Sequence, residues 1–215
     1  TNLSGETQQG SIILPLGSSS LSVRIAGWME SEVLTKEEPK PLMFNVTNLK
    51  NVPVAIEVVY QVYREKEGDK GKIVLGDCVL QGKVMSNQEW IPEDLYALPS
   101  GNYRIKAMTK DESGKECDHA IRFMLFSLND KRVAALDKIW FYRGGTDLEK
   151  DNEVAICFGT KEKDVYLFYD VYADNKRIES KRLQFSDSLL VFRYAYREEY
   201  GDGLNINFAY LKNGV

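Results

Sequence analysis

Apolar and polar residues alternate with a period of two along much of the chain, and this pattern limits its fold more than any other feature. In the segment VAIEVVYQVYR, Val58, Tyr60 and Val62 fall on one face of an extended strand, whereas Glu57 and Gln61 fall on the other. The segments YRIKAMT and LNINFAY repeat this alternation. Because successive side chains of a strand point to opposite faces of its sheet, the pattern predicts half-buried β-strands.

Turn-forming sequences separate the predicted strands, among them EGDKGK, DESGK, GTKEKD, ADNKR and YGDGL. Such runs recur every ~8–14 residues, a spacing typical of antiparallel sandwiches rather than of alternating strands and helices. The segment VYLFYDVYA is apolar on both faces, so we expect it in the middle of a sheet or against a neighbouring domain. Only SNQEWIPEDLYAL, in which Pro92, Glu93 and Asp94 suit a first helical turn, predicts a short helix.

The segment LYALPSGNYRI predicts a corner of an immunoglobulin-like sandwich. Pro99, Ser100 and Gly101 turn the chain, and Tyr103 then enters the next strand with its hydroxyl free to reach back to the backbone. A tyrosine that only fills the core is the alternative. We therefore expect an all-β protein with two immunoglobulin-like antiparallel β-sandwich domains in tandem, since 215 residues suit two domains of ~100 residues.

The predicted organisation has four parts. Residues 21–128 form a first sandwich, residues 129–138 a linker, and residues 139–215 a second sandwich, with about six strands between Ile139 and Leu211. The first residues, TNLSGETQQGSIILPLGS, are similar to TKDESGKECDHAIRFMLFS, because both contain a Ser-Gly turn, a charged residue and an apolar run. Residues 1–20 are thus expected to be the last hairpin of a preceding module, and the second sandwich to be truncated at its C-terminal end.

Charge and hydropathy argue against two classes of partner. The net charge is −4 and no long basic cluster occurs, so no nucleic-acid partner is expected. The apolar runs are shorter than the ~20 residues of a membrane helix, so no direct membrane insertion is expected. The first ten residues lack signal-peptide features, but a processed chain looks the same, so this leaves the compartment open.

Residues that could carry catalysis are few. The single histidine, His119, precedes an apolar strand face and is interpreted as a partly buried structural residue rather than a base. The acidic segments REEYGD and DLEKDNE lack the EF-hand pattern, and RGG and GDG lack the helix that a phosphate-binding loop precedes. We expect no catalytic, cofactor-binding or metal site, and no enzymatic activity.

The three cysteines, Cys78, Cys117 and Cys157, show no metal-ligand spacing. A disulfide between Cys78 and Cys117 stays open. Cys157 alternates away from Ile156 and Phe158, which predicts a place on the less buried face of its strand.

Four aromatic residues lie near predicted strand ends or domain edges: Trp28, Trp90, Trp140 and Tyr142. We interpret them as core and interdomain packing, because aromatic side chains bury large areas. A platform for carbohydrate or a protein partner is the alternative.

Three segments resemble macroglobulin-like modules of bacterial alpha-2-macroglobulins, most of all the very large Bacteroides-type forms: PLMFNVTNLKNVPVAIEVVYQVYRE, IPEDLYALPSGNYRIKAMTKDESGKE and WFYRGG…EVAICFGTKEKDVYLFYDVYADNKRIESKRLQF. The start TNLSGETQ resembles a recurring tail of the same family. The resemblance implies tandem modules of a longer protease-trapping inhibitor in the periplasm or outside the cell, with a lipid anchor on the parent protein as one option. Its partners would be neighbouring modules and, through the intact parent, proteases.

Many members of that family carry an internal thioester built from a Cys-x-Glu-Gln motif. None of the three cysteines begins such a motif, so no reactive residue carries over. The segment ESEVLTKEEPKP, Glu30 to Pro41, looks the most accessible to proteases, but an ordinary interstrand connection is the preferred interpretation. The expected function is that of non-catalytic structural modules; the alternative is a cell-surface module that binds carbohydrate or host protein.

Overall fold

The computed structural model describes residues 19–144 and 153–212, and nearly all of its regular structure is β-strand. The strands are β1 (Leu21–Ala26), β2 (Glu32–Thr35), β3 (Met43–Asn48), β4 (Glu57–Glu67), β5 (Ile73–Met85), β6 (Gly101–Lys110), β7 (Glu116–Phe126), β8 (Ile139–Arg143), β9 (Glu153–Thr160), β10 (Val165–Ala173), β11 (Lys176–Phe185), β12 (Ser188–Ala195) and β13 (Leu204–Lys212). The predicted helical turn is confirmed as α1 (Glu93–Tyr96). No helix among the described residues is long and apolar enough to cross a bilayer.

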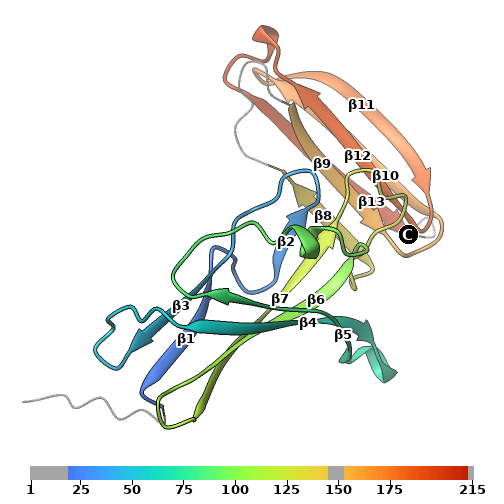
Figure 1. Cartoon of the computed structure of the whole chain (residues 1–215). Helices are drawn as coiled ribbons and strands as arrows, with labels where there is room; N and C mark the ends of the chain where they lie inside the picture. Colours follow the sequence, from blue (N-terminus) through green and yellow to red (C-terminus); the bar gives the residue numbers. More distant parts are fainter. Residues whose placement is uncertain (1–18, 145–152, 213–215) are drawn as a thin grey trace, which may run out of the picture.

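The strands form two β-sandwiches (Figure 1). In the first sandwich, the pair β1-β3 faces a five-stranded sheet of order β2-β7-β6-β4-β5. In the second, the sheets have orders β12-β9-β8 and β11-β10-β13. All pairs are antiparallel except β2 with β7, which confirms the predicted fold class of immunoglobulin-like antiparallel sandwiches.

The predicted inner faces of the central strands are confirmed. Val58, Tyr60 and Val62 of β4 are buried, whereas the residues between them are half-buried. In β10, the inner residues Val165, Leu167, Tyr169 and Val171 are buried, and the strand lies between β11 and β13 as its two apolar faces predicted. The predicted hairpin within residues 1–20 and most of the acidic segment DLEKDNE lie outside the described residues.

The predicted tyrosine corner is present at the start of β6. The Tyr103 hydroxyl donates a hydrogen bond to the carbonyl oxygen of Pro99. Its buried ring stacks on Phe123 of β7, with 5.4 Å between ring centroids. The corner thus fixes the turn before β6 to the core of the first sandwich.

Replacing Tyr103 with phenylalanine should lower the free energy of unfolding by about 1 kcal/mol, because the Pro99 carbonyl loses its partner while the ring stays packed. Urea denaturation measures the change. Tyr63→Phe is the matched control, since the Tyr63 hydroxyl binds Gln61 on the half-buried outer face of β4. Equal losses in the two variants would contradict a special role for the corner.

Asp111 ties the β6–β7 turn to the residues that precede β1. One carboxylate oxygen accepts hydrogen bonds from Ser113 and the Lys115 amide, and the other accepts from Ser19 and Ser20. These hydrogen bonds, that from the Ser113 hydroxyl above all, hold the pKa of Asp111 well below its usual value.

The lowered pKa of Asp111 predicts an acid-dependent loss of stability. The ionised carboxylate stabilises the folded state above the pKa of an unfolded aspartate, ~3.9, and this contribution disappears as the pH falls toward the lower pKa of the folded state. Asp111→Asn should therefore be less stable than the parent at neutral pH, and the difference should shrink on acidification. Thermal unfolding across pH tests this, and a difference that does not vary with pH would contradict it.

Candidate functional site at the junction of the two sandwiches

Strand β7 is buried on both faces where it approaches the second sandwich. Phe123 and Leu125 point into the first sandwich, whereas Met124 and Phe126 point to the opposite face. Phe126 is only 1% exposed although it lies on the outer face of its sheet. Residues beyond β7 must therefore cover this face, and Figure 1 shows β2, β7 and β8 where the two sandwiches meet.

An apolar cluster joins the two sandwiches at this place, and we call it the junction cluster. Its buried members are Met124, Phe126, Val133, Ala135, Trp140, Cys157 and Leu189. The Phe126 ring meets Trp140 and Tyr142 edge to face, with centroid distances of 5.0 and 4.9 Å. Trp140 and Tyr142, two residues apart on β8, stack on each other. Such pairs add to the stability that area burial supplies.

The segment between β7 and β8, predicted as a linker over residues 129–138, packs against both sandwiches. Val133 and Ala135 are buried in the junction cluster. The Ala134 carbonyl accepts a hydrogen bond of 2.6 Å from the side-chain amide of Asn102 on β6, and the Lys131 carbonyl accepts one of 3.0 Å from the backbone amide of Leu189 on β12. A segment held from both sides restrains the two sandwiches far more than a flexible tether does.

The prediction that Cys157 lies on the less buried face of its strand is wrong, because Cys157 is 0% exposed. Strand β9 has no solvent face here: Phe158 packs inward near Phe208, with ring centroids 6.3 Å apart, and Cys157 belongs to the junction cluster on the opposite face. Burial raises the pKa of the Cys157 thiol to about 11. Burial, reinforced by the nearby carboxylate of Glu38, likewise raises the pKa of Tyr142 to about 12.

Thiol reactivity should report whether the junction is closed. In a Cys78→Ser/Cys117→Ser variant, Cys157 should react with a thiol reagent at least ~10-fold more slowly than it does in the denatured chain, because reaction needs an opening of the junction. The variant that keeps only the exposed Cys78 is the control and should react freely. Equal rates for the two thiols would contradict a closed junction.

Glu65 forms a polar cluster beside the junction with two arginines of neighbouring strands. Its side chain is 2% exposed, and one carboxylate oxygen lies 2.8 Å from Nη2 of Arg104 and 3.2 Å from Nε of Arg122. The three residues come from β4, β6 and β7, so the cluster pins these strands to one another. A carboxylate paired in this way is suited to structure rather than to proton transfer.

His119 lies half-buried on β7, as expected for a structural residue near a strand end. Its Nδ1 atom accepts a hydrogen bond of 3.2 Å from the backbone amide of Ile25. The imidazole therefore links β7 to β1 of the facing sheet. The described residues contain no group of three or more histidine, cysteine, aspartate or glutamate side chains placed to hold a metal ion.

The interpretation of Glu30 to Pro41 as a plain interstrand connection is wrong in its middle part. Residues 32–35 form β2, which pairs in parallel with the end of β7 and buries Leu34 completely. Four residues with one acidic end carry too little alternation to mark a strand in the sequence.

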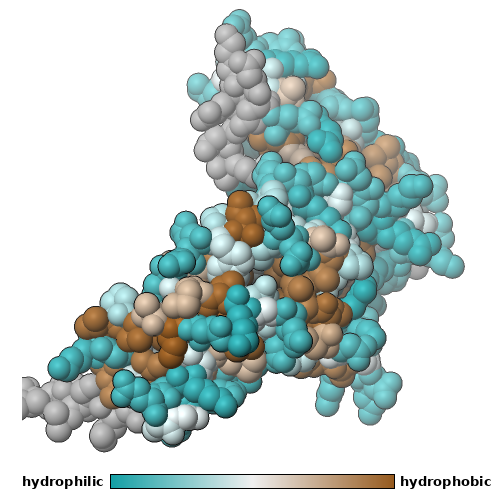
Figure 2. Space-filling view, viewed as in Figure 1, coloured by the Kyte–Doolittle hydropathy of each residue, from teal (hydrophilic) through white to brown (hydrophobic). Residues whose placement is uncertain are grey.

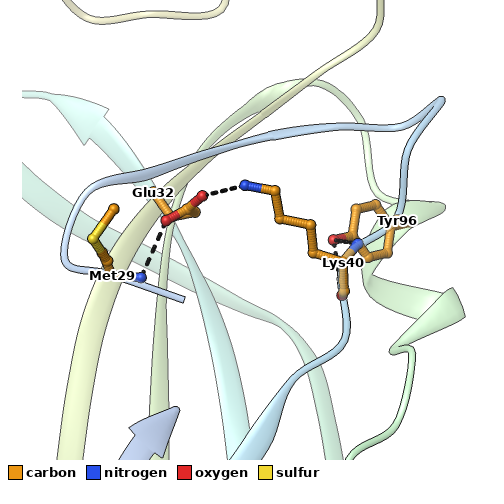
Figure 3. A network of polar contacts seen from close by, with 4 residues as sticks. All are labelled: Met29, Glu32, Lys40 and Tyr96. Carbon is orange, nitrogen blue, oxygen red and sulfur yellow. Dashed lines mark hydrogen bonds and ion pairs between the residues drawn. The ribbon is translucent and has the colours of Figure 1, made fainter. Parts of the chain in front are cut away.

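Polar contacts hold the ends of this segment as well (Figure 3). The Glu32 carboxylate binds Lys40 at 2.6 Å and the Met29 amide at 3.2 Å. The Lys40 amide donates to the Tyr96 hydroxyl, which in turn donates to the Lys40 carbonyl. Just before the linker, the Glu37 carboxylate accepts hydrogen bonds from the Ser127 hydroxyl and the Leu128 backbone amide.

The interpretation of the four aromatic residues as packing residues is confirmed. Trp28 and Trp140 are buried and Trp90 is half-buried. Trp28 lies 5.3 Å from Phe123, and Trp90 lies 5.0 Å from Phe44, between ring centroids. Figure 2 shows apolar side chains on the visible face of the first sandwich in patches that hydrophilic residues separate.

The three thiols are free. Cys117 lies on β7 and Cys78 on β5, and the sheet order places β6 and β4 between them. Three interstrand spacings of ~4.8 Å separate these thiols by roughly 14 Å, beyond the reach of a disulfide. The Cys78–Cys117 bond that the sequence leaves open is thereby excluded.

Comparisons with known proteins return structural similarities only. No protein-family model and no curated protein matches the sequence. Native Escherichia coli alpha-2-macroglobulin is 10% identical over 91% of this chain, with a TM-score of 0.32, and the chain spans 15% of its length. A tetra-tandem repeat from the extending region of a large adhesion protein is 9% identical over 90% of the chain and 47% of its own, with a TM-score of 0.29. Bacteroides uniformis beta-glucuronidase 3 is 13% identical over 89% of the chain and 23% of its own, with a TM-score of 0.29.

Proposed function

We propose that the chain is a non-catalytic pair of macroglobulin-like modules, of the Bacteroides type, in a longer alpha-2-macroglobulin-like protease trap of the cell envelope. The sequence resemblance described above supports the family. The observation that carries the mechanical role is the junction cluster with its fixed connecting segment, because two modules held in this way move as one body.

The mechanical role follows from how the interfaces between modules respond when the parent protein is cleaved. The two modules would move together, while a cleavage elsewhere in the parent protein would repack their interfaces with neighbouring modules, because interfaces between sandwiches of one chain are typically modest in area. The proposed partners are neighbouring modules of the same protein and, through the whole protein, proteases. Glu65 and His119, the polar side chains best placed to do chemistry, are engaged in holding strands together.

The trap itself can be tested on the longer protein that carries this chain. After incubation with an endoprotease, a trap leaves the enzyme active on a small peptide substrate but blocks its action on a large protein substrate. The same protein with Phe126→Ala should be cleaved at the same rate yet shield the protease less. If the parental protein leaves both substrates equally accessible, the proposal fails.

One observation favours a second candidate, a binding module. On the outer face of β10, the Arg182 guanidinium lies 4.8 Å from the ring centroid of Tyr166 and 5.2 Å from that of Phe168. Two partly exposed aromatic rings with a cation over them suit a sugar ring or an acidic partner segment. A glycan array probed with the parent and with Tyr166→Ala tests this candidate, which requires binding that the variant loses.

A further inference from the structure

A cavity of about 550 Å³ lies at one end of the sheet β11-β10-β13 in the second sandwich. Its walls come from the end of β10, the turn between β10 and β11, the turn that precedes β13, and the start of β13. Six of the residues that line it carry an aromatic ring, a carboxylate or an amide: Tyr172, Asp174, Asn175, Asp202, Asn205 and Asn207. Neither candidate function above uses this cavity.

Two turns with defined backbone shapes form walls of the cavity. Asp174 and Asn175 are the two residues of the tight turn between β10 and β11, and their φ angles are positive, 45° and 61°. Tight turns of this kind favour aspartate and asparagine. Gly201 lies in the turn before β13, and a Cβ atom there would collide with the carboxylate of Asp174. The two turns therefore pack closely together, so the cavity exists before a ligand arrives and little ordering is needed on binding.

The pairing of β10 with β13 places two amides beside the aromatic ring. Tyr172 alternates with the buried Val171 and so lies on the outer face of β10, where it is half-buried. The paired residues are Tyr172 with Asn205, and Asp170 with Asn207. Because paired residues of antiparallel strands share a face, both asparagines lie on the outer face as well, and both are exposed. One ligand can therefore contact the ring and the amides together.

These side chains match the two kinds of surface that a sugar presents. One face of a sugar ring consists of C–H groups that pack on an aromatic ring, and its rim carries hydroxyls that both donate and accept hydrogen bonds. An asparagine side chain offers a donor and an acceptor side by side, and an aspartate offers two acceptors. The cavity has three asparagines and two aspartates, and all five are exposed.

The charge of the lining favours a neutral ligand. No lysine or arginine is among the described residues that line the cavity, so no cation there balances a phosphate or an acidic sugar. A basic peptide would use the two aspartates, whereas the hydroxyls of a sugar use the three amides as well. A neutral sugar therefore satisfies more of the lining than either charged ligand does.

We propose that this cavity binds one unit of a neutral oligosaccharide, with the sugar ring on Tyr172 and its hydroxyls hydrogen-bonded to Asn205 and Asn207. The rest of the glycan follows the outer face of β10 toward Tyr166, six residues and so roughly 20 Å away. The site rests on the second candidate function, carbohydrate binding, and deepens it by naming the ligand class and the residues that select it. It does not depend on the protease trap.

The glycan array tests the site with two variants of the full chain, Tyr172→Ala and the double variant Asn205→Ala/Asn207→Ala. We expect the parent to bind neutral oligosaccharides, and each variant to bind the same glycans at least ~10-fold more weakly, because it loses a ring contact or two hydrogen bonds. Tyr63→Ala and Asn129→Ala are the matched controls. Tyr63 is half-buried on the outer face of β4 and Asn129 is exposed in the linker, so both controls should bind as the parent does.

The outcomes separate this site from the candidate function on which it rests. If the parent binds no glycan, both the candidate function and the site are wrong. If Tyr166→Ala abolishes glycan binding while Asn205→Ala/Asn207→Ala leaves it unchanged, the candidate function stands and the cavity is not the site. The double variant removes only exposed side chains, so it decides the question even if Tyr172→Ala fails to fold.

Two further measurements identify the ligand class. Binding should persist in EDTA, because the side chains contact the hydroxyls directly; a loss of binding in EDTA would show that a metal ion bridges protein and sugar, and would overturn the proposal. A parent that binds only acidic glycans, or that binds a lysine-rich peptide and no neutral glycan, would overturn it as well.

Discussion

Replacing Phe126 with alanine should uncouple the two sandwiches. The side chain is 1% exposed and contacts Trp140 and Tyr142 across the junction, so its loss leaves a cavity lined by residues of both sandwiches. Large-to-small changes of a buried phenylalanine cost about 3–5 kcal/mol. We expect the parent to unfold in one calorimetric transition and Phe126→Ala to unfold in two, because the substitution removes the interface that makes unfolding cooperative.

The Cys157 thiol supplies a second, local measurement of the same change. In the Cys78→Ser/Cys117→Ser background, Phe126→Ala should raise the labelling rate of Cys157 toward that of a denatured chain. Phe44→Ala is the matched control, because Phe44 is fully buried in the core of the first sandwich and is not part of the junction cluster. It should destabilise the first sandwich without increasing the labelling of Cys157 in the folded protein.

A single transition in Phe126→Ala with unchanged labelling of Cys157 would show that the junction does not couple the sandwiches. If the variant fails to fold, Phe126→Leu removes less volume and should give the same changes with smaller amplitude. Phe44→Leu then replaces Phe44→Ala as the matched control.

The sequence predicts the strands well where burial is one-sided. In β4 and β6, polar residues mark the outer face, so alternation alone identifies Val58, Val62 and Ile105 as core. The tyrosine corner is predictable for a similar reason, because its turn residues and Tyr103 are neighbours in the chain. These features depend on local patterns, and local patterns are what a sequence displays directly.

The junction could not be predicted in the same way, since it depends on contacts between distant residues. The alternation that places Cys157 opposite Ile156 is correct, but it does not show that β7 and the linker cover the opposite face. Likewise, β2 forms because the end of β7 offers a parallel partner, which its own four residues do not reveal. Burial on both faces of β7 was visible in the apolar run FMLF, and that run was the one available signal for the site.

Adding volume at Gly159 should open the junction as well, although Phe126→Ala removes volume from it. A Cβ atom at Gly159 would lie 2.8 Å from the Cβ and Cγ2 atoms of Val133 and 3.3 Å from Cδ1 of Leu189. Gly159→Val should therefore push the connecting segment off β9 and cost about 1–3 kcal/mol. We expect faster labelling of Cys157, as for Phe126→Ala. We also expect calorimetric unfolding of Gly159→Val to begin at a lower temperature than that of the parent.

A second substitution separates this steric effect from a general loss of stability. Val133→Ala removes Cγ2, one of the two Val133 atoms that the new side chain would strike, so combining it with Gly159→Val should restore part of the protection of Cys157. Leu21→Ala, at the half-buried start of β1 and far from the junction, should give no such rescue. If the double variant is as reactive as the sum of its single changes predicts, Val133 does not seal the junction and the connecting segment is only a tether.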